Sequence, residues 1–192
     1  MKTMKPSKNI LIQNRFLAHL RTSFCALAII GVPLALPSSA ADRAGRSVGA
    51  PEPVSGDFFP CFSFAGPPRQ VGDNLIITFN VTATGTGSLT GTLVGTEMDV
   101  VRPDGSITLH GSGLFTGSVN GRDGTFLMTY SGRATGGHEI LHIAGVRGTD
   151  DLAGAHLQGT AEGDVGGQPP PGCDPPSIGG HGTYTGQVIF AP

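Results

Sequence analysis

Period-two alternation between Arg102 and Ala134 constrains the fold of this chain more than any other feature. The apolar members of the two alternating runs are Ile107, Leu109 and Phe115, followed by Phe126, Met128 and Tyr130. Such alternation places apolar side chains on one face of a β-strand. Turn sequences at 103–105 (PDG), 120–121 (NG) and 123–124 (DG) bound the runs, because proline presets φ and glycine accepts a positive φ. The stretch therefore predicts a β-hairpin.

Similar alternation predicts strands along most of the chain. In the segment 73–84, one face is apolar and is expected to line the core; it carries Leu75, Ile77, Phe79 and Val81. Thr78, on the opposite face, is expected to point to solvent. Further strands are expected at 57–64, 88–101, 138–147, 152–162 and 182–190. Pro60 restricts the first of them to a sheet edge or a bulge, because proline lacks the N–H that the ladder needs.

These eight strands are joined by short turns at the spacing of an antiparallel meander. The 31 glycines oppose helix formation, at a cost of about 1 kcal/mol for each glycine within a helix. We therefore predict an all-β fold: an antiparallel, mostly meander, eight-stranded barrel. The lumen of such a barrel is either packed with side chains or wide enough for one small ligand.

The first forty residues have the order of a secretory signal peptide. Basic residues up to Arg21 precede the apolar run 24–36, and Ser38, Ser39 and Ala40 supply small residues for cleavage. A transmembrane anchor is disfavoured, because it needs about 20 apolar residues and this shorter run contains Pro33. We expect a signal peptide at 1–40, a flexible lead-in at 41–56, a barrel domain at 57–192, and secretion or export to the periplasm.

Cleavage would leave Cys61 and Cys173 as the remaining cysteines. In an oxidising compartment they are expected to form one disulfide, the alternative being two unrelated buried thiols. Cys173 lies within the Pro- and Gly-rich segment 166–180, which is expected to be a long structureless loop before the last strand. The disulfide would tie this loop to the first strand.

The charge of the chain from Ala41 onward excludes several functions. Seven arginines, no lysine and fourteen acidic residues give a net charge of −7. Nucleic acid is disfavoured as a partner, because phosphate binding needs a concentrated basic patch. The absence of lysine excludes a Schiff-base mechanism. No membrane partner is expected after cleavage, and the oligomeric state is left open.

Four blocks of sequence carry a resemblance to a known family: GSLTGTL, GSGLFTGSVNGRDGTF, RGTDDLAGAHLQGTAEG and GTYTGQVIF. They resemble an uncharacterised bacterial family catalogued only as a domain of unknown function, which is similar to allene oxide cyclase-type and dirigent-type barrels. The resemblance covers about 75–190. It implies an eight-stranded barrel and at most a small hydrophobic ligand, and it supplies no catalytic residues. The proline-rich loop and the cysteines depart from the usual pattern.

The sequence HEILH at 138–142 matches H-E-x-x-H, in which a helix presents two histidines to one zinc and the glutamate is the general base. The surrounding glycines favour a strand instead, and the third ligand expected at position 148 is itself a glycine. On a strand, His138 and His142 would lie about 13 Å apart. One zinc with bonds of about 2 Å cannot hold both. We therefore predict no metal and no cofactor.

Other polar residues are candidates for a site in the lumen. Glu97 and Asp99 share one strand face, which either lines the lumen or is a solvated outer face. The single histidines His110, His156 and His181 are more typical of surface groups than of ligands. The candidate catalytic residues are Glu97, His110 and Tyr130. The candidate ligand-binding residues are Phe79, Phe126, Met128 and Tyr130.

The sequence favours a secreted, non-enzymatic β-barrel that binds a small hydrophobic ligand or a partner. The first alternative is a cofactor-free cyclase or isomerase acting in the lumen, by analogy with the fold alone. The second is a structural protein of the envelope or matrix. A cyclase needs a polar group beside a shaped apolar pocket, so the surroundings of the candidate catalytic residues discriminate between these functions.

Overall fold

The structure, a computed structural model, describes residues 49–167, 170–173 and 176–191 of the 192-residue chain. The predicted signal peptide and the first half of the predicted lead-in, 41–48, lie outside these residues. Within them, the structure has no helix with the length and apolar character needed to cross a membrane.

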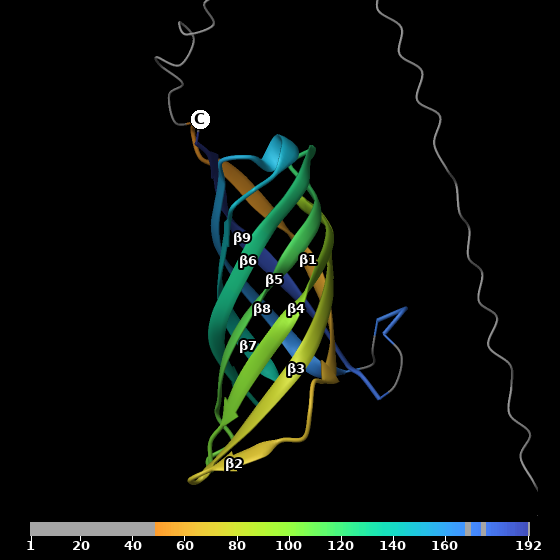
Figure 1. Ribbon diagram of the computed structural model, residues 1–192, viewed down its shortest axis with the longest axis vertical. Helices are drawn as coiled ribbons and strands as arrows, with labels where there is room; N and C mark the ends of the chain where they lie inside the picture. The colour runs from red at the N-terminus through yellow and green to blue at the C-terminus, as the bar shows by residue number, and fades with distance from the viewer. Residues whose placement is uncertain (1–48, 168–169, 174–175, 192) are drawn as a thin grey trace, which may run out of the picture. The chain divides into compact units, whose positions relative to one another are not determined.

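The described residues form antiparallel strands and one short helical turn (Figure 1). The long strands are β1 (Glu52–Phe64), β3 (Asn74–Gly85), β4 (Leu89–Val101), β5 (Ile107–Val119), β6 (Arg122–Thr135), β7 (His138–Val146), β8 (Ala155–Gly167) and β9 (Ile178–Phe190). From β3 to β9 each strand pairs with the next, and β1 pairs with both β9 and β3. These pairings close an eight-stranded barrel and confirm the predicted fold class. The short β2 (Arg69–Val71) pairs with β3, and η1 (Asp150–Leu152) is a 3-10 turn.

The predicted hairpin consists of β5 and β6. Its turn residues Asn120 and Gly121 have φ values of 50° and 81°, the pair of positive values found in a type I′ turn. This turn matches the right-handed twist of the flanking strands, so β6 begins at once with Arg122 opposite Val119. The predicted turn is therefore confirmed at 120–121 but is shorter than expected, because Asp123 and Gly124 lie inside β6.

The first strand is longer than predicted. It begins at Glu52, within the predicted flexible lead-in, because residues 52–58 pair with β9 and Val54 is buried. The edge position predicted as one alternative for Pro60 is wrong, since β1 lies between two neighbours. The ladder to β9 skips Phe59 and Pro60, and this interruption accommodates the missing proline N–H.

The loop before the last strand is shorter than predicted. β8 continues to Gly167 through an irregularity at 165–167, and β9 begins at Ile178. β8 also starts later than expected, at Ala155, because η1 occupies the residues before it.

The predicted disulfide between Cys61 and Cys173 is confirmed, and the Cα atoms of the two cysteines lie 5.7 Å apart. The disulfide joins residues 112 positions apart in the sequence. In the chain-entropy model, closing a loop of that many residues stabilises the fold by about 4 to 5 kcal/mol.

Inward-facing side chains form two apolar clusters. The largest fully buried members of the main cluster are Phe126, Leu109, Leu152, Val119 and Val188. A second cluster contains Phe62, Phe79 and Val81, with Ile77 packed against it. The predicted inner face of β3 is therefore confirmed at Phe79 and Val81, and Leu75 and Ile77 are half-buried. Thr78 is exposed, as the alternation predicts.

Candidate functional site

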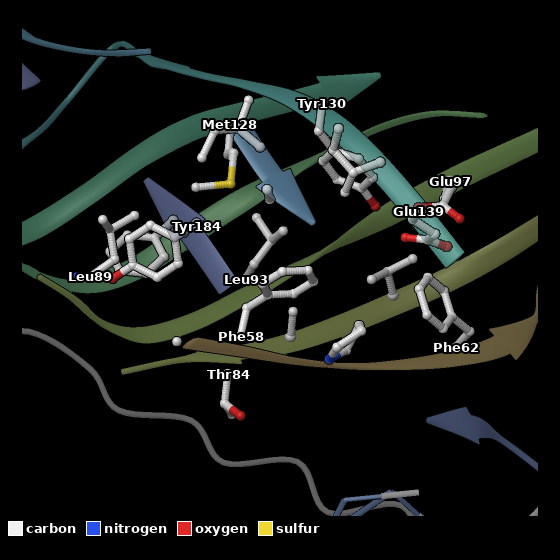
Figure 2. A pocket seen from close by; sticks show the side chains of 18 residues that line it. Phe58, Phe62, Thr84, Leu89, Leu93, Glu97, Met128, Tyr130, Glu139 and Tyr184 are labelled. Carbon is white, nitrogen blue, oxygen red and sulfur yellow. Dashed lines mark hydrogen bonds between the residues drawn. The ribbon is translucent and has the colours of Figure 1, made fainter. Parts of the chain in front are cut away.

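A cavity of about 90 Å³ lies inside the barrel, and most of its lining is apolar (Figure 2). Leu93, Phe115, Met128, Ile143 and Ala161 form part of its wall. For comparison, a cavity of about 150 Å³ holds benzene, whereas pockets for drug-sized ligands measure roughly 300 to 1,000 Å³. The lumen is therefore mostly packed, and by this comparison the remaining space fits a molecule smaller than benzene, with about four heavy atoms.

Polar side chains gather at one part of the cavity wall. Figure 2 shows the carboxyl groups of Glu97 and Glu139 beside each other and the hydroxyl of Tyr130 directed toward them. Asp99, two residues beyond Glu97 on β4, is also buried, but it lies behind Glu97 and does not line the cavity itself. The exposed fractions of Glu97, Asp99 and Glu139 are 4%, 9% and 7%. This burial excludes the solvated outer face for Glu97 and Asp99. We call these four residues the carboxyl cluster.

The hydroxyl of Tyr184, on another part of the wall, already has its hydrogen-bond partners. It accepts a hydrogen bond from the Leu89 N–H at 2.7 Å and donates one to the Thr86 carbonyl at 2.8 Å. Polar recognition of a ligand in the cavity therefore depends on the carboxyl cluster.

Burial is the main cause of the unusual acidities in the cluster. It raises the pKa of Glu97 to about 9, and the carboxyl groups of Asp99 and Glu139 add to the rise. Burial likewise raises the pKa of Glu139 to about 7, with a smaller contribution from Asp99. It also raises the pKa of Asp99 and of Tyr130. Glu97 is therefore neutral at pH 7, so its carboxyl proton can be donated to Asp99 while its oxygen accepts the Tyr130 hydroxyl.

A glycine allows Tyr130 to reach Glu97. Gly111 on β5 is the cross-strand neighbour of both residues. A Cβ atom at this position would overlap the ring of Tyr130. Because glycine has no side chain, the ring of Tyr130 can lie over the β5 backbone. Its hydroxyl then reaches the carboxyl group of Glu97 on β4.

The structure brings some of the candidate residues together and separates others. Glu97, Met128 and Tyr130 line the cavity. Phe126 is buried in the main cluster and Phe79 in the second one, but neither lines the cavity. His110 is exposed on the outside of β5 and does not contribute to the site.

The HEILH segment is a strand, so the helical metalloprotease alternative is wrong. Alternation exposes His138 and His142 and buries Glu139 among the cavity residues. The two ring nitrogens of His138 lie 2.9 Å from carboxylate oxygens of Asp164 and Glu162. These contacts, with Asp164 first, raise the pKa of His138. Sequence reasoning missed Glu139 because it considered the glutamate only as part of the motif.

Comparison with known proteins gives a family and a fold. A model for a family of proteins of unknown function, DUF3224, matches residues 68–169. A crystal structure of a DUF3224 protein with unknown function from Shewanella oneidensis MR-1 is similar, with a TM-score of 0.57 and 19% sequence identity. The similarity covers 74% of this chain and 99% of that chain, and at this identity it shows the fold alone. None of the curated proteins matches. Because the family model spans more than half of its length, the chain belongs to the DUF3224 family.

Proposed function

We propose that this protein binds a small, largely apolar molecule in the lumen of its barrel. The observation that carries the proposal is the apolar cavity of about 90 Å³ with polar groups on one part of its wall. Binding sites for small molecules have this composition: an apolar lining with a few polar groups that fix orientation. The volume restricts the ligand to about four heavy atoms unless the lining moves.

The proposal places the protein outside the cytoplasm, secreted or in the periplasm. The disulfide between Cys61 and Cys173 supports this location, because such bonds persist in oxidising compartments. The signal-peptide pattern of residues 1–40 supports it as well.

Filling the cavity tests the proposal. We expect 1-propanol to bind the protein, with a heat of binding measurable by titration calorimetry, and Ala161→Leu to weaken that binding at least tenfold. Ala161 is buried in the cavity wall, so the added side chain takes the space of the ligand. Ala144→Leu is the matched control, since Ala144 lies on the opposite face of β7 from the cavity residue Ile143.

Equal binding by both variants would contradict the proposed site. Thermal unfolding of Ala161→Leu should show that it remains folded, because overpacking typically costs about 1 to 3 kcal/mol. If 1-propanol does not bind at all, the barrel fold is unaffected and the structural role in the envelope or matrix becomes the favoured function.

The second candidate function is a cofactor-free cyclase or isomerase. It is favoured by two carboxyl groups on the same cavity whose pKa values differ, about 9 for Glu97 and about 7 for Glu139. Such a difference provides a proton donor and a proton acceptor at the same pH. The resemblance to allene oxide cyclase-type and dirigent-type barrels supports this candidate by analogy alone.

A further inference from the structure

The carboxyl cluster has acidic groups from two strands and no basic group beside it in the cavity. The described residues that line the cavity include no arginine, lysine or histidine. The neighbouring His138 points to the outside of β7, and the chain has no lysine beyond Ala41. Buried carboxyl groups are normally paired with a cation or kept neutral, since an isolated buried charge is costly. In the protein without a ligand, protonation of the carboxyl groups neutralises them in place of a cation.

The cluster also has more hydrogen-bond acceptors than donors. One oxygen of Asp99, Oδ1, is buried and has no hydrogen-bond partner among the described residues. Such buried unpaired atoms are rare in folded proteins. The Tyr130 hydroxyl supplies one donor, and the carboxyl proton of Glu97 supplies another. An ammonium group would bring three more donors and a positive charge, whereas an alcohol brings one donor.

From these observations we propose that the ligand is a small primary amine, whose ammonium group contacts the carboxyl cluster and whose alkyl chain lies along Leu93, Met128 and Ile143. The inference rests on the proposed function and names the chemical class of its ligand. The volume of about 90 Å³ suits a chain of about three carbons. Such an amine, with a pKa near the value of about 10.4 for lysine, is charged at pH 8.

Binding is coupled to the loss of a proton. When the ammonium group arrives, the carboxyl group of Glu97 releases its proton to solvent and becomes the carboxylate of an ion pair. The other groups that face Glu97 are Asp99 on the same strand, Tyr130 on β6 and Glu139 on β7. None of these three groups carries a positive charge. The ammonium group of the ligand is therefore the cation that pairs with the Glu97 carboxylate.

Calorimetry of the full chain with n-propylamine and 1-propanol at pH 8 tests the inference. The two probes have the same size, and the amine should bind at least tenfold more tightly, because hydrogen bonds between charged groups are stronger than neutral ones. Titrations in two buffers with different protonation enthalpies should show that the amine, and not the alcohol, releases a proton on binding.

Variants assign the effect to the cluster. Glu97→Gln should weaken n-propylamine binding at least tenfold and remove most of the preference for the amine over 1-propanol. Asp123→Asn removes one exposed carboxylate from β6 and should change neither affinity. Equal affinities for the two probes, or amine binding unaffected by Glu97→Gln, would overturn the inference and leave the proposed function standing. Failure of both probes to bind would overturn both.

Discussion

Truncation of Phe79 to alanine should lower the free energy of unfolding by about 3 kcal/mol, near the lower end of the range for buried phenylalanines. Phe79 is 7% exposed, and its ring centre lies 5.8 Å from that of Phe62 and 5.1 Å from that of Phe64. The loss should be near the lower end because Phe64 is 52% exposed and can shift into the space left behind. Urea denaturation measures the change.

The matched control for this prediction is the adjacent residue. Thr78→Ala changes an exposed side chain on the same strand and should alter the free energy of unfolding by no more than about 0.5 kcal/mol. Similar losses in the two variants would contradict the assignment of the inner and outer faces of β3.

The free energy of unfolding should decrease as the pH rises from about 5 to 9, which is the second large effect. Glutamates in the unfolded chain have a typical pKa of about 4.3. In the folded protein, Glu97 and Glu139 keep their protons until the pH reaches their raised pKa values. These pKa values are about 7 for Glu139 and about 9 for Glu97. Each proton that the folded state retains lowers stability by up to about 1.4 kcal/mol per pH unit.

Glu97→Gln should remove most of this dependence between pH 7 and 9. The amide has the shape of the neutral carboxyl group, so it can donate to Asp99 and accept from Tyr130 without titrating. The variant should be more stable than the natural protein at pH 9. Asp123→Asn, the exposed control, should keep the natural slope. Denaturation curves at pH 6, 7, 8 and 9 give the comparison, and parallel slopes for Glu97→Gln and the natural protein would disprove the assigned burial.

The alternation of apolar side chains predicts much of the fold, because a strand with one buried face must repeat every two residues. The β5–β6 hairpin follows from it, together with the NG turn. Residues 52–56 were not predicted as part of a strand, since their proline, glycine, serine and charged glutamate are typical of a linker. Their pairing with β9 depends on barrel closure, a long-range contact that local sequence does not encode.

The candidate site was predicted only in part. Glu97 and Tyr130 follow from strand alternation, and their contact depends on Gly111, whose role is visible only when two neighbouring strands are aligned. Glu139 could have been found from the same alternation, because the strand that exposes His138 and His142 turns the residue between them inward. The size of the cavity depends on how all inward side chains pack, and no pattern along one strand reports it.

Methyl signals of methionine give the most direct test of ligand binding in the lumen. Met128 lines the cavity, whereas Met98 is 43% exposed on the outer face of β4. In the full chain with ¹³C-labelled methionine methyl groups, addition of 1-propanol should shift the Met128 signal in a saturable way and leave the Met98 signal in place. Comparable shifts of both signals, or a Met128 signal that does not respond, would contradict binding in the barrel lumen.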